Sequence, residues 1–303
     1  MIPIADSHCD FLSYHVLEKG DSRLHDQTDL VRMRRGGVRF QVFAVWVPPE
    51  HENRLESGFR QIEYLQGFIA QSGGQVRLCT RKAHLGLNKS IAAVLAIESG
   101  ESMNCSLEAI EEAYLLGVRM LSLTWNGENA FACGCGQKGG LKPLGREAIS
   151  LMNTLHMALD VSHLNEEGFW EAIDAYSGSP CASHSSAFAL CAVPRNLNDR
   201  QIEAIILRGG YMGINFYTEF LRGKTAGVED VLAHIEHVLS LGGMDTVGFG
   251  SDFCGIQYTP EGLGSAADFQ ALPEAMVRRG YPESLIKKIC YGNYVSYILK
   301  FLE

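Results

Sequence analysis

The sequence lacks the features that mark membrane, secreted and disulfide-rich proteins. No apolar run approaches the roughly 18 residues that a membrane-spanning helix needs. The first residues contain no basic stretch followed by a long apolar run and a cleavage site, so we expect no secretion signal. The nine cysteines are scattered and include no CxxC pair, which argues against a zinc ribbon and a disulfide framework. We therefore expect a cytoplasmic protein with reduced thiols.

Positive charge is also scarce. The chain has 26 Lys and Arg against 35 Asp and Glu, which gives a net charge of −9. Because the basic residues form no long run, neither nucleic acid nor an anionic membrane surface is an expected partner. What the sequence does have is 303 residues with an apolar share of 46%, which is enough to bury a sizeable core.

Apolar runs rich in β-forming residues alternate with helical patterns along the chain. The runs are nearly continuous in apolar residues, as expected of parallel strands that are covered on both faces. We predict strands at Ile2–Asp6, Phe40–Val47, Ala92–Ile97, Met120–Thr124, Met157–Val161, Cys181–Ser183, Tyr211–Phe216 and Thr246–Gly250. Helices are predicted between them, at Gly58–Gln71, Ser106–Leu116, Glu147–His156, Asn165–Ala175, Asp199–Leu207 and Val228–Leu241.

This alternation predicts a (β/α)8 barrel, an α/β fold of the TIM-barrel type, with residues 1–303 as one domain. The alternative is an open, doubly wound parallel sheet. One helix start is clearly marked, because Asn198 can cap a helix while Gln201 bonds back to it. A barrel makes one further demand, that the chemistry lies just beyond the carboxyl ends of the strands.

Polar side chains of the types that bind metals follow the predicted strands. The stretch DSHCD places His8 and Asp10 two residues apart after the first strand, so that they point the same way on an extended chain. Later strands are followed by four further residues of this kind, namely Glu98, His163, His184 and Asp252. Each is common by itself as a hydrogen-bonded loop anchor, but their coincidence at one barrel end predicts a metal site.

Five of these residues form a ligand set of two carboxylates and three imidazoles: His8, Asp10, Glu98, His163 and His184. Imidazoles suit Zn²⁺ or a similar first-row divalent ion, whereas Ca²⁺ and Mg²⁺ prefer oxygen shells. One zinc ion needs about four ligands, so five ligands with a Glu able to bridge predict two ions. Two ions about 3.5–4 Å apart share a water that is ionised near neutral pH and attacks a carbonyl carbon.

Several longer motifs follow one another through nearly the whole chain. They are DSHCD, AIESGES, LTWNGEN, GLKPLGREAISLMN, DVSHL, ASHSSAFAL, PRNLND, GGYMGINF, GFGSDFCG and YGNYV. In content and order they resemble the membrane (renal) dipeptidase family of metallopeptidases, peptidase family M19. The resemblance implies a (β/α)8 barrel with two zinc ions, in a bacterial-type soluble member of that family.

The resemblance also implies a role for each site residue. His8 and Asp10 would hold one zinc ion, His163 and His184 the other, and Glu98 would bridge the two. Asp252 matches the acid that takes a proton from the bridging water and passes it to the leaving amine. Arg195 matches the residue that binds the free C-terminal carboxylate of a dipeptide, a contact that suits its planar guanidinium.

One position departs from the family pattern. Mammalian members have a histidine after the fourth strand that binds the substrate carbonyl oxygen, and this chain has Trp125 there. An indole donates one hydrogen bond and carries no charge, so Trp125 would polarise a carbonyl more weakly or would wall the pocket. Asn126 and Asn129 are alternative donors, and Asn215 is expected to contact substrate from the end of the seventh strand.

The leading hypothesis is a zinc-dependent dipeptidase that acts by attack of a metal-bridging hydroxide. Its substrates would be L,L dipeptides and, as in the family, dipeptides with a C-terminal D-residue. The alternative is a binuclear metal amidohydrolase that acts on N-acyl amino acids or another small amide. A non-enzymatic binding barrel would bind no metal, or would show no amide turnover. A homodimer is compatible with the sequence.

Overall fold

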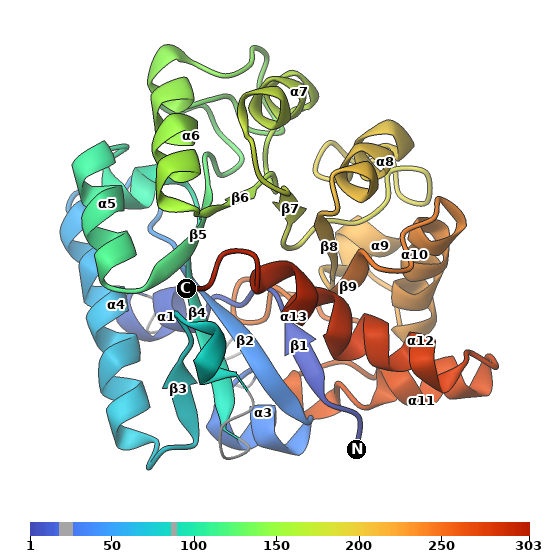
Figure 1. Ribbon diagram of the computed structural model, residues 1–303. Coiled ribbons are helices and arrows are strands. Elements are labelled where there is room, and N and C mark those ends of the chain that lie inside the picture. Colours follow the sequence, from blue (N-terminus) through green and yellow to red (C-terminus); the bar gives the residue numbers. More distant parts are fainter. Residues whose placement is uncertain (18–26, 86–89) are drawn as a thin grey trace.

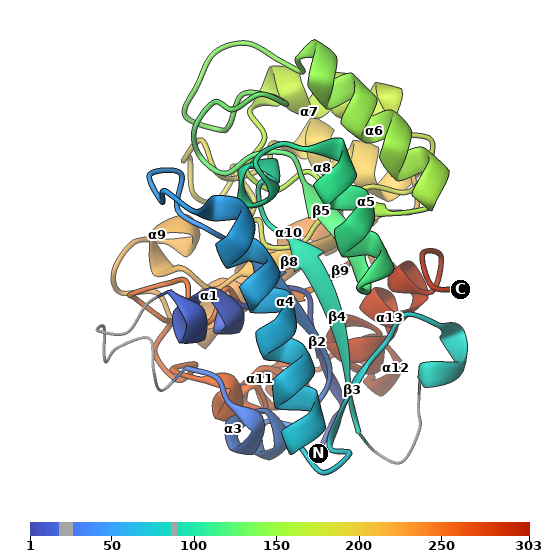
Figure 2. The same cartoon turned by 90° about the vertical axis from the view of Figure 1, so that its left-hand side faces the viewer.

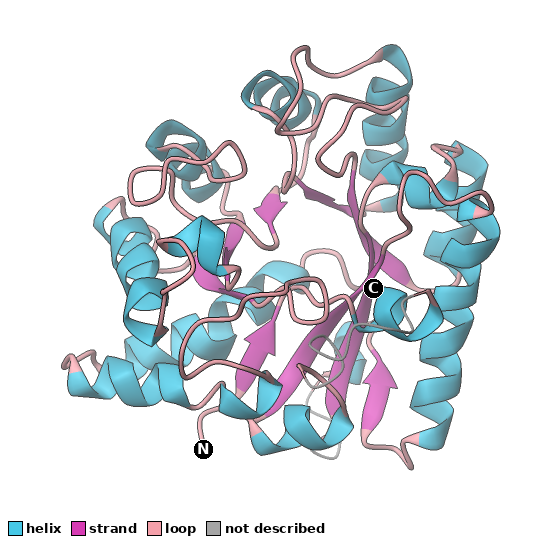
Figure 3. Cartoon of the chain, turned by 180° about the vertical axis from the view of Figure 1, so that it is seen from behind, coloured by secondary structure: helices cyan, strands magenta, loops and turns pink. Residues whose placement is uncertain are grey.

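Parallel strands form one continuous sheet at the centre of the molecule. The structure is a computed structural model that describes residues 1–17, 27–85 and 90–303. Within these residues the strands are β1 Ile4–Asp6, β2 Val38–Val45, β3 Val76–Leu78, β4 Ile91–Ile97, β5 Val118–Ser122, β6 Ala158–Asp160, β7 Cys181–Ala182, β8 Tyr211–Asn215 and β9 Val247–Gly250. Seen from behind, the strands lie inside a layer of helices (Figure 3).

The sheet closes on itself into a barrel. Neighbouring strands follow the order β2, β1, β9, β8, β7, β6, β5, β4, β3, and β2 also pairs with β4. The closing pairing runs from Phe40 opposite Ala92 to Val45 opposite Ile97. The strand β3 pairs with β4 alone among the described strands, over Ile91 to Ala93. It therefore lies outside the closed ring, and the other eight strands make up the barrel.

The eight predicted strands are confirmed, each within two residues of its predicted ends. The (β/α)8 barrel is therefore the fold of the chain, and the open doubly wound sheet is wrong. The strand β3 was not predicted. Its three residues form too short a run to stand out in the sequence, and only Val76 among them is fully buried.

Helices cover the outside of the barrel (Figures 1 and 2). The α-helices of the described residues are α1 Phe11–Val16, α3 Leu30–Arg35, α4 Arg54–Gln71, α5 Leu107–Leu115, α6 Pro143–Leu155, α7 Glu166–Ala175, α8 Asp199–Leu207, α9 Thr218–Leu221, α10 Val228–Ser240, α11 Ala271–Arg278, α12 Glu283–Lys287 and α13 Asn293–Ile298. Short 3₁₀ turns lie at Lys82–His84, Gly100–Met103 and Ala266–Asp268, and a π-helical turn lies at Lys288–Gly292.

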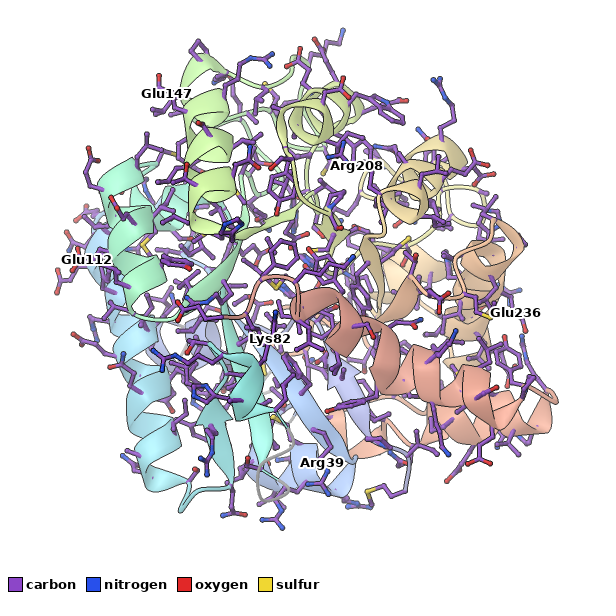
Figure 4. All side chains as sticks on the ribbon, viewed as in Figure 1. Arg39, Lys82, Glu112, Glu147, Arg208 and Glu236 are labelled. Carbon is purple, nitrogen blue, oxygen red and sulfur yellow. The ribbon has the colours of Figure 1, made fainter. Side chains whose placement is uncertain are left out.

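The helices keep their polar faces toward solvent. Glu112, Glu147 and Glu236 lie on the outer faces of α5, α6 and α10 and point away from the sheet (Figure 4). Among the described residues, none of the helices combines the length and apolar character that crossing a bilayer requires.

The predicted helices are confirmed, with differences at two N-termini. The capping box of α8 is present, because Asn198 and Gln201 each accept a hydrogen bond from the other's backbone N–H. The helix α6 begins at Pro143 rather than Glu147, since proline at the first helical position sacrifices no helical hydrogen bond. The helix α4 begins at Arg54 and contains Gly58, where a Cβ would lie 2.5 Å from the carbonyl oxygen of Ser102.

Small residues allow the strands to approach closely below the site. Ser7 Oγ lies 2.5 Å from the carbonyl oxygen of Ser183 and 2.8 Å from that of Phe249. A Cβ at Gly213 or Gly250 would lie only 2.2 or 1.9 Å from the Ser183 oxygen, so neither position accepts a larger residue. This narrow interior brings the strand ends, and the side chains that follow them, into contact range.

Candidate metal centre and active site

Four strand ends place the predicted metal ligands around one point. His8 and Asp10 follow β1, Glu98 follows β4, His163 follows β6 and His184 follows β7. All five residues are more than nine-tenths buried. These positions lie at the carboxyl end of the barrel, where the fold is expected to carry its chemistry. The structure therefore brings together residues that lie as far as 176 positions apart, from His8 to His184.

The carboxylate of Glu98 lies between two groups of histidines. Its Oε1 is 2.9 Å from Nε2 of His163 and 3.5 Å from Nε2 of His184. Its Oε2 faces the other way and lies 3.4 Å from Nε2 of His8. The backbone fixes this placement, because the Glu98 N–H donates to the carbonyl oxygen of Val45 on β2. A carboxylate whose two oxygens face different ligand groups has the arrangement that a bridging ligand requires.

His163 and His184 turn unprotonated nitrogens toward the centre. Their Nε2 atoms lie 2.9 Å apart. His184 Nδ1 lies 2.7 Å from the hydroxyl oxygen of Ser183, whose proton goes to the Asp160 carboxylate, so Nδ1 must donate. His163 Nδ1 likewise donates to Asn126 Oδ1 at 2.8 Å. With the ring proton on Nδ1 in both cases, each Nε2 presents a lone pair.

Two more carboxylates surround His8. Its Nε2 lies 3.5 Å from Asp10 Oδ2 and 3.9 Å from Asp252 Oδ1. The loops that carry them are tied together by backbone bonds, from the N–H of Asp10 to the oxygen of Phe253 at 2.8 Å and from the N–H of Asp252 to the oxygen of His8 at 3.1 Å. The same nitrogen of His8 is buried and has no hydrogen-bond partner among the described residues.

The electrostatics of the centre show how these groups depend on one another. Burial and the positive charge of Arg195 lower the pKa of His163, and burial and the charge of His8 lower that of His184 well below its ordinary value. Burial would also lower the pKa of His8, but the carboxylates of Glu98 and Asp10 outweigh it and raise that pKa well above normal. Burial and the charge of Glu98 raise the pKa of Asp10. Without a cation, the centre therefore holds protons to offset its crowded carboxylates.

This donor set fits divalent cations. Three lone-pair atoms, Nε2 of His163, Nε2 of His184 and Oε1 of Glu98, face one another without a proton between the two nitrogens. Two triads have donor atoms within 4.8 Å of one another, His8 with Glu98 and His184, and His8 with Asp10 and Asp252. Imidazole together with carboxylate is the ligand chemistry of zinc and related first-row ions. The triads group His8 with His184 rather than His163 with His184, so the predicted division of ligands between two ions stays a prediction.

Backbone strain marks the exits from three strands. Ser99, His163 and Asp252 have φ values of 64°, 70° and 62°, in the left-handed region that favours glycine. Such residues cost about 1–3 kcal/mol each and cluster at functional sites. The three follow β4, β6 and β9, where the chain turns away from the barrel to form the loops of the site.

Arg195 lies in the loop between β7 and α8 and is 5% exposed. Its Nη1 donates to Ser185 Oγ at 2.8 Å and its Nη2 to the carbonyl oxygen of His184 at 2.9 Å, both neutral groups. Its Nε is buried without a partner among the described residues. A buried guanidinium held only by neutral groups is suited to receive a carboxylate.

The remaining predicted residues have different surroundings. Asn215 is fully buried and donates to Asp252 Oδ2 at 2.8 Å while its Oδ1 accepts from the N–H of Tyr217. Asn129 is held inside its own loop by bonds to Leu123 and to the N–H groups of Phe131 and Ala132. Asn215 thus orients Asp252, and its contact with substrate, like that of Asn126, stays a prediction.

A pocket of about 460 Å³ opens above the centre. It is lined by Asp10, Ser13, Trp46, Glu98, Trp125, Asn126, His163, Tyr217, Phe220, Asp252, Cys254, Gly255, Ile256 and Gln257. Trp125 is thus a wall of the pocket, with its ring centre 6.3 Å from that of His163.

Several residues of the site were not predicted from the sequence. A Cβ at Gly255 would lie 2.2 Å from Asp10 Oδ2 and 2.8 Å from Asp252 Oδ1, so glycine is needed to let the two carboxylates approach. Trp46 lines the pocket, and Asp160 and Ser183 set the tautomer of His184. The motifs DVSH and ASHS did contain a signal for the last pair, since Asp160 lies three residues before His163 and Ser183 lies directly before His184.

Comparison with known sequences identifies related proteins. A sequence model described as "Membrane dipeptidase (Peptidase family M19)" matches residues 1–300. An uncharacterised dipeptidase of Schizosaccharomyces pombe is 30% identical over 283 residues, which span 86% of this chain and 68% of that protein.

Two solved structures share the fold along the full length. A metallo-peptidase of Rhodobacter sphaeroides, liganded with a phosphinate mimic of the dipeptide L-Ala-D-Ala, superimposes with a TM-score of 0.90 at 27% identity and covers 99% of both chains. The dipeptidase AC, a metallo-peptidase of family M19, superimposes with a TM-score of 0.89 at 30% identity and covers 99% of this chain and 98% of its own.

Proposed function

The chain belongs to the membrane dipeptidase family of metal-dependent peptidases, peptidase family M19, and we propose that it hydrolyses dipeptides with two zinc ions per chain. The observation that carries the proposal is the position of Glu98, with one oxygen toward His163 and His184 and the other toward His8. Residues 1–303 act as one catalytic domain in this proposal.

Five residues would hold the ions: His8, Asp10, Glu98, His163 and His184. When bound, the ions supply Lewis acidity toward the peptide carbonyl and lower the pKa of the attacking water. The protein holds the donors in place with bonds behind them, such as the bond from His184 Nδ1 to Ser183, because ligands that are already oriented bind more tightly.

Asp252 is the proposed general base and acid. Its Oδ2 accepts a hydrogen bond from Asn215, which leaves Oδ1, 3.9 Å from His8 Nε2, free to face the centre. A carboxylate there can take a proton from the attacking water and deliver it to the amine that leaves. Its position on the pocket lining supports this role.

Arg195 is the proposed site for the C-terminal carboxylate of the substrate. Its charge is close enough to lower the pKa of His163, and its protein partners are neutral. When the C-terminal carboxylate binds Arg195 and the peptide carbonyl lies at the metal centre, there is room for only one residue beyond the cleaved bond. A dipeptide is therefore the fitting length. The related R. sphaeroides enzyme was liganded with a mimic of L-Ala-D-Ala, and we extend the proposal to L,D as well as L,L dipeptides.

The test is an assay of the zinc-loaded protein on free dipeptides of L,L and L,D configuration beside N-acetylated amino acids. We expect hydrolysis of dipeptides, with loss of activity on chelation and recovery with zinc. Hydrolysis of the N-acetylated amino acids alone would instead identify an amidohydrolase with another substrate and would contradict the proposal. Turnover of neither group would contradict it as well.

A further inference from the structure

The pocket carries two tryptophans on one side of the metal centre. Trp46 follows β2 and Trp125 follows β5, and both line the pocket. Their ring centres lie 5.3 Å apart with the planes tilted by 57°, so that they form one continuous aromatic surface, here called the tryptophan wall. Both side chains are only partly buried and therefore have surface left to offer a ligand.

Hydrogen bonds and close packing fix the backbone of both tryptophans. The N–H of Trp46 donates to Gln61 Oε1 at 3.1 Å, and Gln61 Nε2 donates to the carbonyl oxygen of Trp46 at 2.7 Å. Gln61 is itself fully buried on α4. Near Trp125, a Cβ at Gly134 would lie 2.2 Å from the Trp125 carbonyl oxygen, so the loop is packed tightly there. Because this surface is already ordered, the protein loses little conformational entropy when a ligand binds there.

Trp46 lies across the barrel from the strand that precedes Arg195, whereas Trp125, which follows β5, lies two strands from it. Around the closed barrel the strands run β1, β2, β4, β5, β6, β7, β8, β9, which places β7 four strands from β2 in both directions. Arg195 follows β7, and its guanidinium lies 5.9 Å from the ring centre of Phe220, which lines the pocket. A dipeptide with its carboxylate at Arg195 therefore extends across the metal centre, with its N-terminal residue toward β2.

We propose that the tryptophan wall is the subsite for the N-terminal side chain of the substrate. The preferred dipeptides then carry a large apolar or aromatic residue at their N-terminus. The inference rests on the proposed function, because it takes Arg195 as the site of the C-terminal carboxylate. Burying such a side chain against two indoles gains free energy from apolar contact and from ring–ring packing.

The tryptophan wall offers no cationic partner to an acidic side chain. The described lining residues of the pocket include no lysine or arginine, and Arg195 is already taken by the C-terminal carboxylate of the substrate. An aspartate or glutamate side chain beside the tryptophan wall would lose its water and gain no cationic partner. N-terminal acidic dipeptides are therefore expected to be poor substrates.

The experiment measures kcat/KM of the zinc-loaded enzyme on dipeptides X-Ala, where X is Phe, Leu, Ala or Glu and the C-terminal alanine is kept constant. We expect Phe and Leu to exceed Glu by about 10-fold or more. In Trp46→Ala and Trp125→Ala, the ratio of Phe to Ala should fall at least about 10-fold. This ratio does not depend on the fraction of active enzyme, so partial misfolding of a variant cannot imitate the effect.

Trp170 provides the matched control, since it lies on α7 and packs against Phe169 and Arg200 outside the pocket. Trp170→Phe should leave the Phe to Ala ratio unchanged. A wild-type enzyme that cleaves all four dipeptides equally, or Trp46→Ala and Trp125→Ala variants with an unchanged ratio, would overturn this inference and leave the dipeptidase function standing. If no dipeptide were cleaved, the proposed function itself would fail.

Discussion

Nε2 of His163 lies 2.9 Å from Nε2 of His184. Two imidazole nitrogens at this distance need a proton or a cation between them. His184 uses its one ring proton at Ser183, and His163 uses its own at Asn126. Because Glu98 adds a carboxylate oxygen 2.9 Å from His163, the contact is best satisfied by a divalent cation. The proposed metal-dependent activity requires a cation at this contact.

Replacing the bridging carboxylate should remove metal from the protein. Glu98→Gln keeps the size of the side chain but replaces one of the two acceptor oxygens with an NH₂ donor, which cannot bind a cation. We expect the zinc content of the purified variant to fall below that of the wild type by at least half, measured by elemental analysis per chain. Glu101→Gln, on the same loop and half-buried, is the control that should keep its metal. Full zinc content in Glu98→Gln would show that this carboxylate does not bridge.

Replacing Asp252, the proposed general base, should slow hydrolysis without removing zinc from the protein. Asp252→Asn retains the shape of the side chain and the neighbouring bond from Asn215 but cannot take up a proton. We expect kcat to fall about 10²–10⁴-fold while the zinc content stays that of the wild type. Kinetics and elemental analysis on the same preparation measure both quantities. An unchanged kcat would exclude Asp252 as the base, and lost zinc would make it a ligand instead.

The bonds behind His184 should set the affinity of the metal centre. Ser183→Ala removes the acceptor of the His184 Nδ1 proton and the link to Asp160. Loss of such an orienting partner typically weakens metal affinity 10–100-fold, and we expect a loss of about that size in competition with a chromophoric chelator. Ser186→Ala is a suitable control, since Ser186 is equally buried and, among the described residues, its hydroxyl hydrogen-bonds only to the carbonyl oxygen of Asn215, at 3.5 Å. Equal affinities for both variants would contradict the orienting role.

Metal binding should release protons at neutral pH. The carboxylates of Glu98 and Asp10 outweigh burial and raise the pKa of His8 well above its ordinary value, while burial and the charge of Glu98 raise the pKa of Asp10 to about 8. The metal-free centre of His8 and Asp10 therefore holds a proton at pH 7. The lowered pKa values of His163 and His184 mean that these rings are already neutral there and release none. A ligand must lose its proton to bind metal.

Zinc titration by calorimetry in two buffers of different ionisation enthalpy measures this release. We expect a difference in apparent binding enthalpy that corresponds to at least about one proton per chain at pH 7. The number of released protons should fall as the pH rises through the raised pKa values of His8 and Asp10. Identical enthalpies in the two buffers at pH 7 would show that the ligands are unprotonated before the metal arrives.

The sequence predicted the parts of the site that lie at strand ends. A strand followed by His8, Glu98 or His184 is visible in the chain itself, and a closed barrel brings all carboxyl ends of its strands to one face. The eight strands were recognised for the same reason, because parallel strands buried on both faces are continuous apolar runs.

The parts that the sequence did not predict depend on contacts between distant segments. Trp46 is one apolar residue among many at the end of β2, and only the closed barrel shows that it faces Trp125. The need for glycine at position 255 arises from the carboxylate of Asp10, far away in the chain. The polarity of a side chain does not reveal which distant residue it will contact. That depends on the register between the strands.

The most direct test of the two-zinc centre is anomalous X-ray diffraction at the zinc absorption edge from crystals of the zinc-loaded protein. We expect two strong anomalous peaks per chain on opposite sides of the Glu98 carboxylate, one beside His163 and His184 and the other beside His8 and Asp10. The absence of any peak within coordination distance of Glu98 would contradict a bridging role for this carboxylate.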